Sequence, residues 1–217
     1  IKCYPVDIAE EAQIQTAIDD AIKALGGIDI FIANAGVSIP SHAQLVKMSV
    51  FTTTMNTNLM GLIYGIQHII PHFLAKNQGQ IVSISSLAAY RGLPGSSAYS
   101  ASKAAVSAYT ESIRLDLKKT GVAVSLICPG FIKSGMTAKN AFHMPFLMDT
   151  KQGVDAIFNA IQKKKAIYSF PFVMAWAIRL LRLLPSTLYD AILGNRHPEQ
   201  INKEQRHWEY NTSITDE

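Results

Sequence analysis

Short, near-continuous runs of apolar residues recur along the chain, and amphipathic segments long enough to be helices separate them. Such runs occupy residues 30–33, 81–84 and 122–128. Strands of a parallel sheet have this composition because helices cover both of their faces. A strand, helix, strand order then predicts right-handed βαβ units. The sequence therefore predicts an α/β fold with a doubly wound parallel sheet, Rossmann-like, in three α/β/α layers.

Periodicity and turn residues predict the other elements. Extended runs predict a first strand at residues 1–6, which ends at Asp7, and a last strand at residues 166–170. Apolar residues at helical spacing predict helices, which cover residues 9–25, 51–75, 97–117 and 151–164.

The composition is that of one compact domain. The chain has 217 residues, of which 48% are hydrophobic, enough for one full core. We expect residues 1–193 to form a single Rossmann-like domain and residues 194–217 to form a polar tail. A net charge of +4 without an arginine-rich stripe does not indicate a nucleic-acid partner. Two cysteines make no disulfide framework, which favours a cytoplasmic location.

Ser86, Tyr99 and Lys103 form the outline of an acid–base site. Ser86 follows the strand predicted at 81–84, and Tyr99 and Lys103 lie one turn apart on one face of the next helix. Tyrosine has a pKa of about 10, and an ammonium one turn away is expected to lower it. A serine hydroxyl can donate a hydrogen bond to a carbonyl oxygen that gains charge. Together the groups suit proton exchange with a ketone or alcohol while a cofactor carries a hydride.

Two simpler interpretations compete with this one. A tyrosine and a lysine four residues apart usually mark an exposed helix face, and paired serines after a strand usually mark a turn. The order of elements favours chemistry, and the segment resembles the active site of the short-chain dehydrogenase/reductase family, whose pattern is a serine, twelve residues and Y-x-A-S-K. Twelve residues separate Ser86 from Tyr99 here, and residues 99–103 fit the pattern.

The resemblance implies a nicotinamide cofactor, NAD or NADP, with NADP slightly favoured. In the family, an acidic residue at the position of Asp7 contacts the adenine ring, and its neighbour here is Ile8. An N-A-G motif supports the sheet beside the cofactor, and Asn34, Ala35 and Gly36 match it. From the residues alone, Asp7 can also be a helix N-cap, and Gly36 can be a turn glycine with positive φ.

Asn58, followed by Gly61, resembles the fourth active-site position of the family. There the asparagine holds a local helix kink and a water of the proton relay. An asparagine in the middle of a helix is otherwise more often solvent-facing or bonded back to its own helix. The surrounding match favours the relay role.

Pro129 and Gly130 resemble the family's P-G pair after a strand. Four residues after this glycine, family members carry a threonine that binds the nicotinamide amide. Ser134 occupies that position and keeps the hydroxyl, and Thr137 is a nearby alternative. The backbone of Ile132 is expected to touch the carboxamide as well.

The family's glycine-rich loop, T-G-x-x-x-G-x-G, has no counterpart before Asp7. Gly26 and Gly27 end a helix instead of opening one. Two further strands and their helices would need roughly 40–60 residues, at about 30 or more per βαβ unit. We therefore expect the natural protein to be longer, with its first strands before Ile1.

Two apolar segments follow Pro129 and Gly130 along the chain. Residues 131–150 can be a helical core stripe or, as we prefer, an adaptable apolar lid over the substrate. The apolar residues of this lid are Met136, Phe142, Met144, Phe146 and Met148. Residues 171–193 are interrupted by arginines and a proline, so a spanning helix is not expected. Contact with a twin subunit or closure of the substrate pocket is preferred there over contact with a membrane surface.

The implied activity is hydride transfer between NAD(P) and a secondary alcohol or ketone of apolar character. Tyr99 is the acid/base, Lys103 its cation and a ribose ligand, Ser86 the carbonyl stabiliser and Asn58 the water anchor. A homodimer or homotetramer is expected. A non-catalytic scaffold and a peripheral membrane protein are the alternatives. No metal site is expected, because His68-x-x-x-His72 lacks both a glutamate and a third ligand.

Overall fold

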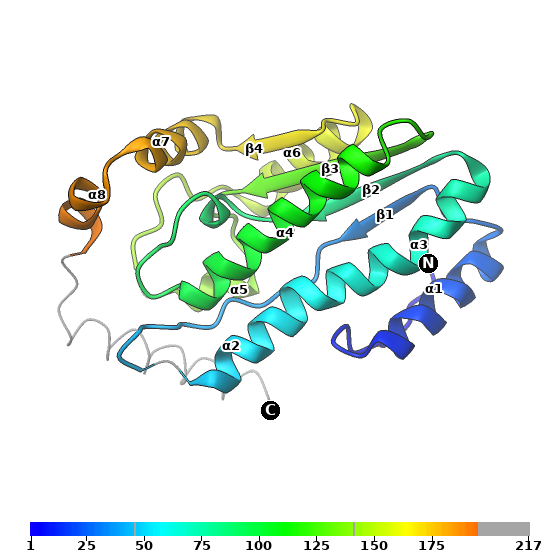
Figure 1. Ribbon diagram of the computed structural model, residues 1–217, viewed down its shortest axis with the longest axis horizontal. Helices are drawn as coiled ribbons and strands as arrows, with labels where there is room; N and C mark the ends of the chain where they lie inside the picture. Colours follow the sequence, from blue (N-terminus) through cyan, green and yellow to red (C-terminus); the bar gives the residue numbers. More distant parts are fainter. Residues whose placement is uncertain (46, 141, 195–217) are drawn as a thin grey trace.

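A parallel sheet forms the centre of the molecule in the computed structural model, which describes residues 1–45, 47–140 and 142–194. The strands are β1 (Ile30–Ala33), β2 (Gly79–Ile84), β3 (Val122–Pro129) and β4 (Ile167–Phe170). They lie side by side in chain order, and every neighbouring pair is parallel (Figure 1). The strands predicted over these four stretches are confirmed.

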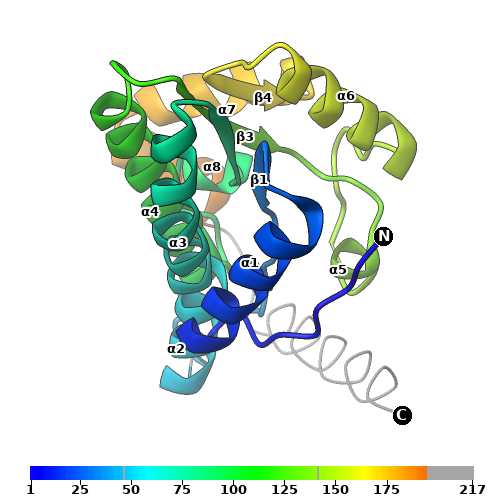
Figure 2. The ribbon, with the colours of Figure 1, turned by 90° about the vertical axis from the view of Figure 1, so that its right-hand side faces the viewer.

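Helices cover both faces of this sheet. Helices α3 and α4 lie on one face, with α1 beside α3, and α6 lies on the other face (Figures 1 and 2). The helices are α1 (Glu11–Leu25), α2 (Met48–Met55), α3 (Gly61–Lys76), α4 (Ser97–Asp116), α5 (Gly135–Ala138), α6 (Thr150–Gln162), α7 (Phe172–Leu183) and α8 (Ser186–Leu193). The predicted three-layer, Rossmann-like α/β/α fold is confirmed.

The main core lies between the sheet and helices α3 and α4. Strand β2 is buried along its whole length, as expected for an inner strand of a parallel sheet. Ile66, Ile69 and Phe73 of α3 are fully buried against Ile81 of β2. Full burial of a side chain of this size contributes about 1.5–3 kcal/mol relative to its exposure. This packing fixes α3 and α4 on the sheet, and these helices carry the candidate site.

The strand predicted at residues 1–6 is wrong. Residues 1–7 are extended coil with no strand, and Ile1, Lys2 and Cys3 are exposed. Pro5 has no N–H group for a strand ladder. The edge of β1 on this side is open, and Ile30 and Ile32 are 46% and 49% exposed.

The helix predicted over residues 51–75 has a different internal structure. Helix α2 passes into a π-helical turn, η1 (Asn56–Met60), which passes into α3 without a break. Single π-turns inside α-helices occur frequently at functional sites. The kink expected at Asn58 therefore takes the form of a π-turn.

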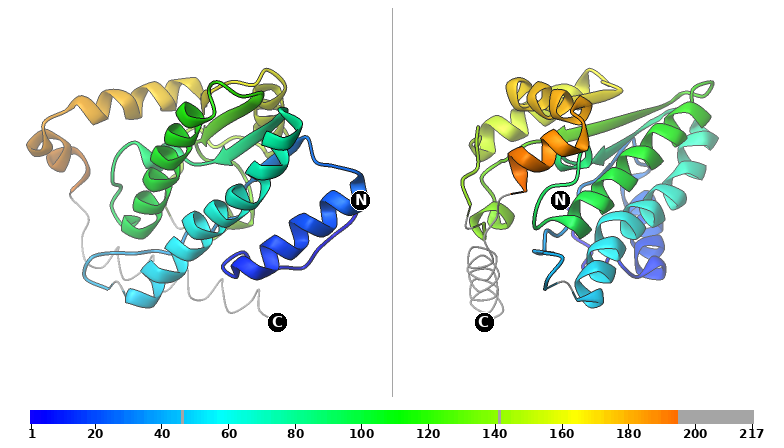
Figure 3. Two further views of the ribbon diagram at one scale, coloured as in Figure 1. Left: turned by 45° about the vertical axis from the view of Figure 1, so that its right-hand side comes forward. Right: turned by 60° about the vertical axis from the view of Figure 1, so that its left-hand side comes forward.

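Helices α7 and α8 build the predicted apolar extension. They extend from the end of β4 past the end of the sheet, as Figure 3 shows most clearly. In the described part of the chain, no helix is both long and apolar enough to cross a bilayer. The polar tail predicted for residues 194–217 lies outside the described residues, apart from Gly194.

Candidate active site

Ser86 and Tyr99 are held where β2 and α4 meet. Ser86 follows β2 and caps a 3-10 turn, η2 (Leu87–Ala89), where its hydroxyl accepts a hydrogen bond from the Ala88 N–H at 3.1 Å. Tyr99 lies in the first turn of α4, where the side chain of Ser86 acts on its hydroxyl and lowers its pKa, although burial raises it by more. Their predicted proximity is therefore present in the structure.

Ser41 fixes the start of α4, a role that the sequence did not reveal. The first N–H groups of a helix have no partner within the helix, and Ser96, the N-cap, makes no side-chain cap. Instead the Ser41 hydroxyl accepts a hydrogen bond from the Ala98 N–H at 3.0 Å, and the Ser97 hydroxyl donates to the Ser41 carbonyl at 2.7 Å. A distant loop thus places the helix turn that carries Tyr99.

Lys103 is a buried cation. Its side chain is 4% exposed, and its Nζ donates a hydrogen bond to the Ile84 carbonyl at 2.9 Å. Burial lowers the pKa of Lys103 from 10.5 to about 8, and the nearby Cys128 acts in the opposite direction. Cys128 is itself buried. A buried ammonium whose bonds are not all used inside the protein is suited to bind a polar ligand.

The pKa of Tyr99 was expected to be lowered by Lys103, and this expected direction of the shift is wrong for this structure. Burial raises the pKa of Tyr99, and the hydrogen bond from Ser86 lowers it by less. The Lys103 Nζ atom lies 5.9 Å from the centre of the Tyr99 ring, because it is drawn toward the Ile84 carbonyl at the end of β2. Tyr99 is consequently the neutral phenol here.

Asn58 connects three parts of the site. It is 1% exposed, so the solvent-facing alternative is wrong. Its Oδ1 accepts a hydrogen bond from the Val37 N–H at 2.7 Å, and its Nδ2 donates to the Val37 carbonyl at 2.9 Å. The same Nδ2 donates to the Ser102 hydroxyl at 3.0 Å, and Ser102 donates to the Tyr99 carbonyl at 2.8 Å. Asn58 therefore ties the loop after β1 to the helix turn of Tyr99.

A glycine is required at position 36 because other side chains lie close to its backbone, and not because the chain makes a left-handed turn there. Its φ is not among the positive values of this structure, so the turn alternative is wrong. A Cβ atom at this position would lie 3.0 Å from Asn58 Oδ1 and 3.4 Å from Lys103 Nζ. Because any side chain would press on both groups, the glycine of the N-A-G motif lets the loop pass directly over them. Asn34 and Ala35 lie before it on the exposed side of the loop.

Asp7 and Ile8 lie near the same end of the sheet, although no strand precedes them. The Asp7 carboxylate accepts a hydrogen bond from the Ala9 N–H at 2.9 Å. Because Glu10 occupies the N-cap position of α1, without a side-chain cap, the N-cap alternative for Asp7 is wrong. A hollow of about 340 Å3 along the open edge of β1 is lined by Ile8 together with Asn34 and Ala35. These residues are brought together as predicted, whereas Asp7 itself is exposed.

The P-G motif leads into the other wall of the site. Pro129 ends β3, and the Gly130 N–H donates to the Phe170 carbonyl at 2.7 Å. Ser134 caps α5, and its hydroxyl lies 3.3 Å from that of Thr137. The Thr137 hydroxyl donates to the Ile132 carbonyl at 2.8 Å. Ser134 and Thr137, the two candidates for binding the amide, therefore stand side by side.

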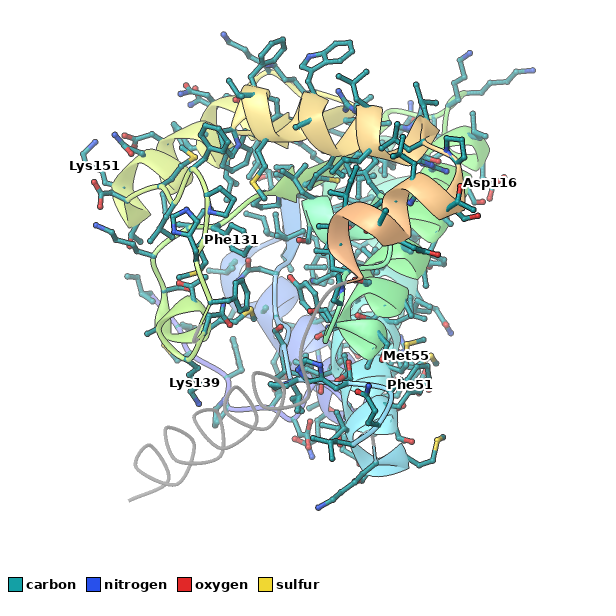
Figure 4. The ribbon with its side chains drawn as sticks, turned by 90° about the vertical axis from the view of Figure 1, so that its left-hand side faces the viewer. Phe51, Met55, Asp116, Phe131, Lys139 and Lys151 are labelled. Carbon is teal, nitrogen blue, oxygen red and sulfur yellow. The ribbon has the colours of Figure 1, made fainter. Side chains whose placement is uncertain are left out.

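A cleft of about 410 Å3 opens between these two walls. Ser86 and Tyr99 lie on one side and Ile132, Ser134 and Thr137 on the other. Figure 4 faces this side of the molecule: the segment that bears Phe131 and Lys139 lies opposite α2 and α4, with α7 and α8 above. A volume of this size suits a small organic ligand.

The predicted lid contributes only part of its apolar residues to the cleft. Met136 and Phe142 line the cleft, whereas Met148 packs on a core cluster and Phe146 is 56% exposed. The helical alternative is wrong, because residues 139–148 contain no helix among those described. Helix α7 adds Met174 and Ile178 to the cleft. Residues 171–193 therefore border this cleft, and their role in closing a substrate pocket stays a prediction.

The two histidines of α3 bind neighbouring protein groups. His68 lies 3.2 Å from a Glu11 carboxylate oxygen, and the ring of His72 contacts the backbone of Ile28. Among the described residues, no cluster of three or more metal-binding side chains occurs.

Comparison with known proteins shows the family. The model for short chain dehydrogenases matches residues 1–144. An uncharacterised oxidoreductase of Myxococcus xanthus is 42% identical over 176 residues, 79% of this chain and 70% of that protein. A 2-(R)-hydroxypropyl-CoM dehydrogenase of Xanthobacter autotrophicus is 34% identical over 134 residues, 60% of this chain and 54% of that protein, so this chain spans about half of it.

A solved structure has the same fold. It is a short chain dehydrogenase from Burkholderia cenocepacia in complex with NADP, with a TM-score of 0.76 and 24% identity, covering 88% of this chain and 80% of the other. The fold is of the Rossmann-like class. The chain belongs to the short-chain dehydrogenase/reductase family, and the predicted family is confirmed.

Proposed function

We propose that the chain is an NAD(P)-dependent oxidoreductase that exchanges a hydride with a secondary alcohol or ketone of apolar character. The observation that supports this most directly is that Ser86 and Tyr99 line one cleft that is also bordered by apolar side chains. The names of the two relatives, an oxidoreductase and a dehydrogenase, agree with this class. The complex of the Burkholderia protein with NADP supports the slight preference for NADP.

The residues present fit the nicotinamide end of such a cofactor. An ammonium has three N–H donors, and Lys103 directs one of them to Ile84. Hydroxyl groups such as those of a ribose are suitable partners for the others. Ser134 and Thr137 offer hydroxyls to a carboxamide. The cofactor, when bound, supplies or accepts the hydride.

Proton transfer falls to Tyr99 and its neighbours. Burial keeps Tyr99 protonated near neutral pH, which is the form that donates a proton to a ketone oxygen. The Ser86 hydroxyl donates a hydrogen bond to the same oxygen as it gains charge. The Lys103 ammonium stabilises the phenolate that remains, and the Asn58 network holds the helix turn that bears Tyr99.

A non-catalytic scaffold on the same fold is the less favoured alternative. A scaffold has no need to bury an ammonium beside a phenol, because such burial is costly, yet Lys103 is 4% exposed. The expected homodimer or homotetramer, the domain limits 1–193, the cytoplasmic location and the membrane contact of residues 171–193 stay predictions.

The test is Tyr99→Phe, with Tyr109→Phe on the same helix as the matched control. Tyr99→Phe should lower kcat for ketone reduction by about 10³-fold, the typical contribution of a positioned acid. NADPH and NADH binding, measured by fluorescence, should change by less than about twofold, because the phenol hydroxyl makes only a small part of the cofactor contact. The control should retain activity. Turnover retained by Tyr99→Phe would refute the proposed role.

A further inference from the structure

Helix α8 is fastened to the body of the protein through very few side chains. None of its residues is buried, and α7 buries only Ala175 and Ile178. Leu193, at the end of α8, nevertheless lines the cleft together with Met174 and Ile178. The position of this helix pair therefore determines how far the cleft extends from Tyr99.

Three consecutive residues after η2 hold the helix pair. The Tyr90 hydroxyl lies 2.8 Å from the Ser169 hydroxyl, and Arg179 of α7 donates to both at 3.2 Å. The Gly92 carbonyl accepts a hydrogen bond from the Tyr189 hydroxyl of α8 at 2.5 Å. Residues 90–92 thus contact β4, α7 and α8 in turn.

Arg91 is the centre of this connection. Its guanidinium donates to the carbonyls of Leu181 and Leu184, the second at 3.1 Å, at the C-terminal end of α7. The Leu181 carbonyl also accepts the capping N–H of Leu184, and the negative end of the helix dipole favours a cation beside these last carbonyls. The same guanidinium lies 3.7 Å from the centre of the Tyr189 ring. One planar group therefore sets the angle between α7 and α8.

The connection continues into the catalytic segment. Residues 93–96 directly follow Gly92, line the cleft and lead into the turn of Tyr99. We infer that Arg91 is a positioning residue that sets the far end of the substrate cleft, and that the substrate is a ketone or alcohol with an apolar chain long enough to reach Met174, Ile178 and Leu193. This inference rests on the proposed function for its substrate and on the contacts above for its geometry.

The experiment uses Arg91→Ala, Arg91→Lys and, as the control, Arg182→Ala. Arg182 is exposed on the same helix pair. The full chain with NADPH is assayed with straight-chain 2-ketones from butanone to decanone. Burial of each additional CH₂ predicts that kcat/KM rises by about fourfold per carbon with chain length in the unaltered protein. Arg91→Ala should lose about tenfold or more with the long ketones and less than about twofold with butanone.

Arg91→Lys should resemble Arg91→Ala more than the unaltered protein, because lysine lacks the planar fork that joins two carbonyls and stacks on a ring. Arg182→Ala should keep the chain-length profile. Equal losses with short and long ketones, or the same change in Arg182→Ala, would overturn the inference.

A second measurement does not depend on activity. Hydrogen exchange followed by mass spectrometry should show faster exchange over residues 172–193 in Arg91→Ala, with α4 unchanged. If all ketones are inert in the unaltered protein, the proposed function fails while this measurement still tests the fastening of the helix pair. Unchanged exchange over residues 172–193 in Arg91→Ala would refute the inference that Arg91 holds helices α7 and α8 in place.

Discussion

Replacing Lys103 by methionine should make the stability of the protein less dependent on pH. The pKa of Lys103 falls from 10.5 to about 8 on burial. Because one pKa unit corresponds to about 1.4 kcal/mol, the buried ammonium destabilises the native state by about 3 kcal/mol at about pH 7. Methionine removes this charge from a site that is 4% exposed and keeps a similar shape.

The sign of the effect follows from proton binding. Between about pH 8 and about pH 10.5, the unfolded chain holds the proton of Lys103 while the native protein has released it. The free energy of unfolding therefore rises with pH across this window. From about pH 7 to about pH 10, Lys103 alone adds about 2.5 kcal/mol of stability. The stability of the variant lacks this rise with pH. The loss of the hydrogen bond to Ile84 lowers its stability equally at both pH values.

Urea unfolding at these two pH values measures the difference. Both proteins should carry Tyr99→Phe, because burial raises the pKa of Tyr99 and this phenol would otherwise add a pH dependence of its own. Lys118→Met, at an exposed position after α4, controls for the loss of one positive charge. A stability gap that stays constant between the two pH values would refute the argument that burial of Lys103 lowers its pKa.

Two further predictions concern the framework. Gly121→Ala should destabilise the protein by about 3 kcal/mol or more in urea unfolding, because its Cβ would lie 1.7 Å from the Asn77 carbonyl oxygen. Gly92→Ala, with open space around the added atom, should change stability by less than about 1 kcal/mol, and equal effects would contradict the clash. Asn58→Ala should cost about 3 kcal/mol and lower kcat, because the partly buried backbone of Val37 loses both of its side-chain bonds. Asn56→Ala, exposed in the same π-turn, is its control, and a similar loss in both variants would contradict the role of Asn58.

The sequence predicted those elements that are decided by local pattern. The inner strands β2 and β3 are buried on both faces, so their apolar runs leave no competing interpretation. The first predicted strand failed because its six residues had no such run and Pro5 interrupts the ladder. Whether a segment forms a strand depends on the strands that pair with it as well as on its own residues. The sequence of residues 1–6 does not show which strand would pair with them.

Some residues of the site could be predicted from a local motif, whereas the role of others depends on contacts with distant parts of the chain. Ser86, Tyr99 and Lys103 could be found because their order and spacing follow from one strand and one helix. Ser102 could have been found too, since it lies within the Y-S-A-S-K segment, but its role depends on Asn58 at a distance of 44 positions. Ser41 and Arg91 carry no local signal at all, because a loop serine and a loop arginine become important only through the helix ends that they meet.

The Tyr99 pKa shows why spacing alone did not suffice for the chemistry. The four-residue spacing correctly brought Lys103 to the same helix face, but the charge-to-ring distance of 5.9 Å is set by the Ile84 carbonyl at the end of β2. An ammonium is compact and mobile on its stem, so it moves to the strongest acceptor within reach. A ribose hydroxyl beside Lys103 would offer it a second acceptor on the side of Tyr99. The working pKa of the acid is therefore a property of the assembled site, in which protein and cofactor together determine where the cation lies.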